Sequence, residues 1–146
     1  MIFKEIEVED NLQELIKVAF NADIKVDGAW GYTKALATVI KEGNATPLVQ
    51  TEFTLATMRA YLEMNMTLEE EVRYGAINLQ ELSREKVEAC YDKVVYEISA
   101  IKENVYKMFI DEYKENSNNK DFDMSAHFAR RKEATLKREV IHWFKV

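Results

Sequence analysis

The chain has few of the residues that interrupt helices or link segments covalently. Its 146 residues include one cysteine, one proline and four glycines. A single cysteine excludes an intramolecular disulfide, which argues against a disulfide-stabilised secreted domain. The scarcity of glycine and proline argues against turn-rich sandwiches and barrels. From these absences we expect an all-α fold.

Long apolar runs are also absent. No stretch approaches the roughly 20 apolar residues needed to cross a bilayer, and the start of the chain lacks the basic and then apolar pattern of a signal peptide. We therefore expect a cytoplasmic protein that does not contact a membrane. The content of 47% hydrophobic and 32% charged residues favours a folded chain. Its length fits one domain.

Charge is unevenly distributed along the chain, whose net charge is −6. Residues 1–123 hold 14 basic and 24 acidic side chains, whereas residues 124–146 hold six basic and two acidic ones. This asymmetry favours attraction between a basic C-terminal helix and the acidic body, either in the same chain or in a second copy.

Apolar residues repeat at helical spacing along most of the chain, which predicts a bundle of about five to six helices. Residues 1–9 form a possible extended or frayed lead-in. Asp10 suits the N-cap of the first helix, and Pro47 suits the first turn of the third. The other helices are predicted at residues 29–43, 67–82, 83–116 and 124–146.

The strongest periodic pattern lies in residues 83–116, where apolar residues alternate steps of four and three, as in a coiled-coil seam. No glycine or proline interrupts this stretch. It predicts one long heptad-patterned helix that outruns its own domain, so that a second copy covers part of it. A central position within the chain's own bundle is the alternative. The predicted interface consists of Val87, Tyr91, Val94, Ile98, Ile101, Val105 and Met108.

Three charged residues, Glu52, Arg59 and Glu63, recur at steps of seven and four beside the apolar side of the third predicted helix. They favour either an ion-pair bridge along that helix or a site for a small polar ligand inside the bundle. Trp30 and Tyr32 lie in a segment that could add an aromatic recognition surface. A core position for Trp30 is the simpler interpretation.

The C-terminal segment predicts a basic helix face opposite an apolar one. Such a face could pack on the acidic body, or it could bind nucleic-acid phosphates weakly through Arg130, Arg131, Lys137 and Arg138. The acidic composition makes nucleic acid the less favoured partner. The predicted basic face consists of His127, Arg131, Arg138, His142 and Lys145.

No catalytic motif such as a P-loop or a dinucleotide-binding fingerprint is present. Glu139 and His142 match the Glu-x-x-His pattern, but a carboxylate-bridged di-metal site requires a second such pair. The sequence therefore predicts neither a metal nor a cofactor. It favours a non-enzymatic interaction or assembly module that forms a homodimer, with small-ligand binding and weak nucleic-acid binding as alternatives.

Overall fold

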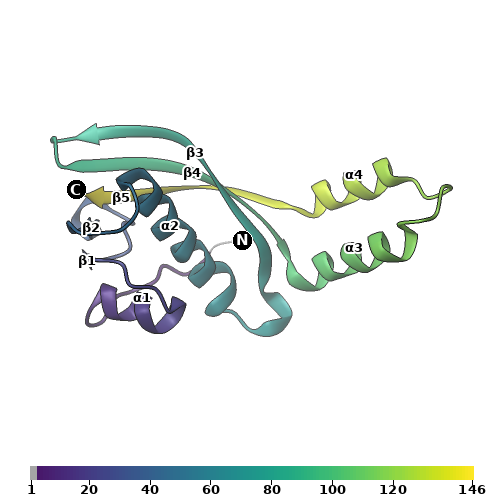
Figure 1. The fold of residues 1–146 in the computed structure, drawn as a ribbon, viewed down its shortest axis with the longest axis horizontal. Coiled ribbons are helices and arrows are strands. Elements are labelled where there is room, and N and C mark those ends of the chain that lie inside the picture. The colour runs from purple at the N-terminus through teal and green to yellow at the C-terminus, as the bar shows by residue number, and fades with distance from the viewer. Residues whose placement is uncertain (1–2) are drawn as a thin grey trace.

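A five-stranded mixed sheet forms the centre of the protein, so the all-α helical bundle predicted from the sequence is wrong (Figure 1). The computed structural model describes residues 3–146, and residues 1–2 of the predicted lead-in lie outside it. The sheet has the order β1-β2-β5-β4-β3, in which only β2 and β5 are parallel. The strands are β1 (Val26–Gly28), β2 (Thr38–Ile40), β3 (Tyr74–Val87), β4 (Tyr91–Lys102) and β5 (Leu136–Lys145).

Four α-helices accompany the sheet in two separate groups. Helices α1 (Leu12–Phe20) and α2 (Leu48–Tyr61) pack on one face, and a π-helical turn at Leu62–Met66 extends α2. Helices α3 (Glu103–Asn116) and α4 (Met124–Ala134) lie between β4 and β5 in sequence and project beyond the end of the sheet (Figure 1). Among the described residues, no helix combines the length and apolarity needed to span a membrane.

The main core lies between this helical layer and alternate residues of β4 and β5. Val94 and Tyr96 of β4 and Phe144 of β5 are fully buried against Leu55 of α2. Their neighbours along each strand point to the other side of the sheet, because successive strand residues alternate between faces. Ile141 is accordingly 42% exposed on that side.

The predicted long helix at residues 83–116 is instead the end of β3, a hairpin turn, β4 and then α3. The turn contains Glu88 and Ala89, whose φ angles are 51° and 62°. These left-handed conformations normally favour glycine or asparagine, so the residues at the turn gave no sign of it. Val94 and Ile98 are four residues apart, a spacing that places two side chains on the same face of a helix. Because the spacing is even, it also places them on the same face of a strand.

The C-terminal segment is also divided between two kinds of structure. It is helical only as α4 and continues as β5, so the predicted helix over residues 124–146 is correct for its first half. The helices predicted at residues 29–43 and 67–82 are wrong, because these segments consist mainly of short helical turns and the strands β2 and β3. The first and third predicted helices are confirmed as α1 and α2, with Asn11 rather than Asp10 capping α1.

Candidate interaction site on the helical arm

The hairpin formed by α3, residues 117–123 and α4, called the arm below, projects from the body of the protein (Figure 1). It is anchored at its base by Glu103. The backbone N–H of Glu103 donates to the carbonyl of Arg73 (2.9 Å), and its Oε1 accepts a hydrogen bond from Nδ2 of Asn65 (2.7 Å). Beyond this base the two helices depend on each other for packing.

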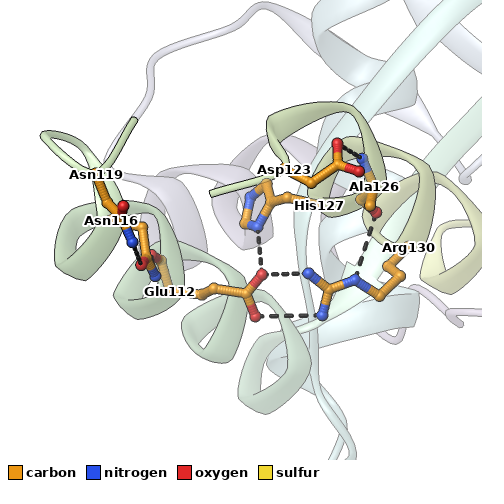
Figure 2. Close-up of polar contacts among 7 residues, drawn as sticks. All are labelled: Glu112, Asn116, Asn119, Asp123, Ala126, His127 and Arg130. Carbon is orange, nitrogen blue, oxygen red and sulfur yellow. Dashed lines mark hydrogen bonds and ion pairs between the residues drawn. The ribbon is translucent and has the colours of Figure 1, made fainter. Parts of the chain in front are cut away.

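On one side of the arm, a polar cluster centred on Glu112 links α3 to α4 (Figure 2). Oε1 of Glu112 lies 2.9 Å from Nδ1 of His127, and both carboxylate oxygens accept hydrogen bonds from the guanidinium of Arg130, one of them at 3.3 Å. Because an ionised carboxylate only accepts, Nδ1 of His127 is the donor. The hydrogen bond from His127, and then that from Arg130, lowers the pKa of Glu112.

The turn at the tip of the arm is also fixed by local hydrogen bonds (Figure 2). Asp123 caps α4 by accepting from the backbone N–H of Ala126 at 3.0 Å, as favoured at a helix N-terminus. Nδ2 of Asn119 donates to Oδ1 of Asn116 at 3.3 Å. Together with the Glu112 cluster, these bonds give the two helices a defined relative position.

Between the helices, the imidazole of His127 is 1% exposed and surrounded by aromatic rings. The centroids of Phe109, Tyr113, Phe122 and Phe128 lie 5.3–6.2 Å from that of His127. Aromatic pairs at such separations are attractive beyond their area of burial. The ring of His127 is therefore a packed centre of the arm.

The other side of the arm is an open apolar groove. It has a volume of about 290 Å³, and its lining includes Ile110 and Tyr113 of α3 and Phe128 of α4. Tyr113 is 45% and Phe128 49% exposed. Tyr106, Ile110 and Tyr113 follow helical spacing, so they form one strip along α3.

Basic side chains flank the groove. On a helical wheel, Lys107 and Lys114 border the strip on α3, and Arg131 and Lys132 lie beside Phe128 on α4. None of the four forms an ion pair with a residue in the described part of the chain. The guanidinium of Arg131 lies over the ring of Tyr106 instead, 5.0 Å from its centroid. The groove therefore combines an apolar floor with unpaired positive charge.

The residues predicted as a ligand site lie under α2, buried except for the half-buried Tyr32, but they form two clusters. Arg59 donates to the carbonyls of Trp30 (3.1 Å) and Ile141 (2.9 Å), and its guanidinium lies over the ring of Tyr32. The hydroxyl of Tyr32 donates to Glu63 at 2.6 Å. Glu63 in turn accepts a hydrogen bond at 2.9 Å from Arg138, a residue assigned to the basic face in the sequence analysis.

Glu52 belongs to the second cluster, with two residues that sequence reasoning missed. Its Oε1 accepts from Nη1 of Arg84 at 2.8 Å, and Nη1 of Arg84 also lies 3.5 Å from Asp92. Burial, followed by a hydrogen bond with Asp92, raises the pKa of Glu52 to about 7. Burial opposes ionisation of Asp92 as well, but its hydrogen bond with Glu52 and its pairing with Lys86 leave its pKa lowered. The two carboxyl groups therefore share one proton near neutral pH.

The two other predicted surfaces are divided among several elements. Of the predicted interface, Val94, Ile98 and Ile101 are buried in the body, and Met108 is 65% exposed on α3. The basic face required one continuous helix, but α4 ends at residue 134. The remaining members are distributed as follows: Val87 and Tyr91 flank the hairpin turn, Val105 lies in the first turn of α3, His127 and Arg131 lie on α4, and Arg138, His142 and Lys145 lie on β5.

No family model, characterised protein or solved structure matches this chain. Within residues 3–146, no group of three or more histidine, cysteine, aspartate or glutamate side chains could hold a metal ion. The polar side chains under α2 form hydrogen bonds mainly with other groups of the protein, whereas the groove of the arm is open. The arm is therefore the stronger candidate for a functional surface.

Proposed function

We propose that the protein is an interaction module whose arm binds an amphipathic helix that carries negative charge. The observation that carries this proposal is the groove between α3 and α4, which leaves Tyr113 and Phe128 about half exposed on a pre-formed helical hairpin. Aromatic side chains beside a groove are typical anchors for a helix of a partner protein.

The charges of the groove select the partner. Lys107, Lys114, Arg131 and Lys132 lie around an apolar floor, so a bound helix gains from acidic side chains on either side of its apolar strip. A third helix laid on the groove would also cover Ile110 and its neighbours. This interaction differs from the predicted coiled-coil interface, because its surface lies on the arm alone.

Binding of a labelled peptide tests the proposal. The probe is a 14-residue helical peptide, matched to the length of α3, with leucines at helical spacing and glutamates on both sides. We expect fluorescence anisotropy to report saturable binding, and we expect Phe128→Ser to weaken it by at least about tenfold because it removes an exposed anchor. Arg131→Glu should weaken binding by reversing a charge at the groove.

Met108→Ser is the matched control, because Met108 is exposed on the opposite side of α3. It should leave peptide affinity unchanged, and a peptide with lysines in place of the glutamates should bind far more weakly. Equal loss of affinity in Met108→Ser and Phe128→Ser, or equal binding of both peptides, would contradict the proposal.

A further inference from the structure

Helix α1 has an apolar strip in addition to the one it buries in the core. Leu12 and Ile16 are buried, whereas Leu15, Val18 and Ala19 line a hollow of about 550 Å³ beside the N-terminal segment. Val18 is 80% exposed, the largest value among the exposed large hydrophobic side chains of the described residues. A second apolar strip on a short helix indicates a further contact surface.

The hollow beside α1 has an acidic rim. Glu7, Glu9, Asp10 and Glu14 line it, together with apolar residues. None of these four carboxylates forms an ion pair with another described residue. The N-terminal wall is held in place, because the backbone N–H of Ile6 donates to the hydroxyl of Tyr32 at 3.0 Å. The hollow is thus a supported surface with unpaired negative charge.

These features complement those of the arm. Helix α1 presents an exposed Val18 at a hollow with an acidic rim, and the arm presents an exposed Phe128 at a groove with basic flanks. An apolar side chain on each surface therefore has a hollow on the other to enter, and the unpaired charges have opposite signs. Helix α1 is amphipathic, and Glu14 in its first turn, together with Glu7, Glu9 and Asp10 just before it, gives its surface the negative charge of the partner in the proposed function.

The two surfaces cannot meet within one chain, because α1 and the arm lie at opposite ends of the molecule (Figure 1). We infer that α1 of one copy binds the arm groove of the next copy, so that the protein assembles head to tail. This inference rests on the proposed function of the groove and adds the identity of its occupant. A contact between two different surfaces produces rings of copies if the rotation between them closes, and open chains with one free surface at each end if it does not.

Complementation between two full-length variants tests the inference. Val18→Glu damages the α1 surface and leaves the arm intact, whereas Phe128→Ser damages the arm and leaves α1 intact. We expect light scattering to show concentration-dependent assembly of the wild type and a monomer for each variant alone. An equimolar mixture should form a complex of two chains and grow no further, because only one intact pair of surfaces remains.

Val49→Glu and Met108→Ser are the matched controls, since both replace exposed apolar side chains outside the two surfaces. Both should assemble like the wild type. As a second measurement, Glu14→Lys and Arg131→Glu should each weaken assembly, and the mixture should recover it because the reversed charges match again.

Three results would overturn the inference: a wild type that stays monomeric at every concentration, a Val18→Glu variant that assembles normally, or variants that do not complement each other. The peptide experiment distinguishes these from failure of the proposed function. If the acidic peptide binds the wild-type groove while the chains do not assemble through α1, the arm keeps its proposed role and only the occupant is wrong.

Discussion

The buried acidic side chains of α2 and of the π-helical turn after it pair with residues that lie far away in the sequence. Glu52 meets Arg84 and Asp92, and Glu63 meets Arg138. Burying a charge is costly unless it is paired and hydrogen-bonded. These contacts therefore fix how α2 lies on the sheet, because a shift of the helix would leave buried charges without partners.

Glu52 makes the stability of the fold depend on pH. Its pKa is about 7, against an ordinary value near 4.5, so the folded state holds this proton to higher pH than the unfolded chain does. The stabilisation that this group contributes is complete below about pH 4.5 and is lost as the pH rises towards about 7. His142 acts in the opposite sense, because its burial lowers its pKa below the usual 6.5. Asp92 and Glu112, whose pKa values are lowered, also lose stabilisation as the pH falls, so the wild-type pH dependence combines several groups.

Glu52→Gln isolates the first effect, because the amide can still donate to Asp92 but does not titrate. We expect the free energy of unfolding of this variant, relative to the wild type, to rise by an amount on the order of 1–3 kcal/mol between about pH 5 and pH 8. Urea unfolding across that range measures the difference. Glu81→Gln is the control, because it removes from the surface a carboxylate that pairs with the same Arg84. A constant difference for Glu52→Gln would contradict the assignment.

The sequence predicted these buried charged residues but not their partners. Glu52, Arg59 and Glu63 were selected because they follow the apolar side of a helix, and all three are buried. Their partners could not be found in the same way. The pairing of Glu63 with Arg138 depends on the position of β5 in the sheet, which spacing along the chain does not encode.

The elements that local sequence signals predicted correctly are α1 and α2. Each has a start signal close to the true helix start and apolar residues at helical spacing. The β3–β4 hairpin was missed because its turn residues are not those of a typical turn, and because Val94 and Ile98 fit two periodicities. The run Val94, Val95, Tyr96 is rich in residues that favour strands, which was the available signal against a helix.

The hairpin turn is consequently a site where a single substitution should increase stability. Ala89 has a φ angle of 62°, a conformation that costs a residue with a Cβ atom about 1–2 kcal/mol. Ala89→Gly removes that cost but gives the unfolded chain more freedom, so we expect a net gain of about 0.5–1 kcal/mol. Ala89→Val should have the opposite effect, because β-branched residues fit this conformation poorly. Urea unfolding of both variants measures the two signs, and a loss of stability in Ala89→Gly would show that the turn is not strained.

On the scale of the whole molecule, the basic side chains of residues 124–146 have several different roles. Arg130 and Arg138 are paired with Glu112 and Glu63 inside the chain. Arg131 and Lys132 carry no ion pair among the described residues and lie beside the groove. The attraction between the basic segment and the acidic body that the sequence favours therefore has two components. One holds the chain together, and the other leaves positive charge unpaired beside the groove.

The arm and the body should be separable, because the arm is inserted between two strands that already pair. Ala100 of β4 lies opposite Leu136 of β5. Replacing residues 103–134 with Asn-Gly leaves a five-residue loop between them, a length that hairpins accept. The replacement loses the two hydrogen bonds of Glu103, so we expect the body to unfold cooperatively with stability reduced by about 1–3 kcal/mol. Urea unfolding followed by tryptophan fluorescence measures this, and a broad, non-cooperative transition would show that the arm belongs to the core.

The body without its arm should also limit assembly of the wild type. It keeps α1, which can enter the groove of a complete chain, but it offers no groove to the next copy. Small amounts added to the wild type should therefore end growing assemblies and lower their average mass in light scattering, in proportion to the fraction added. The same body carrying Val18→Glu should have no effect, because it has lost both surfaces. If the two arm-less proteins act alike, α1 is not the segment that the groove receives, whereas a difference between them traces the contact to one exposed valine on a nine-residue helix.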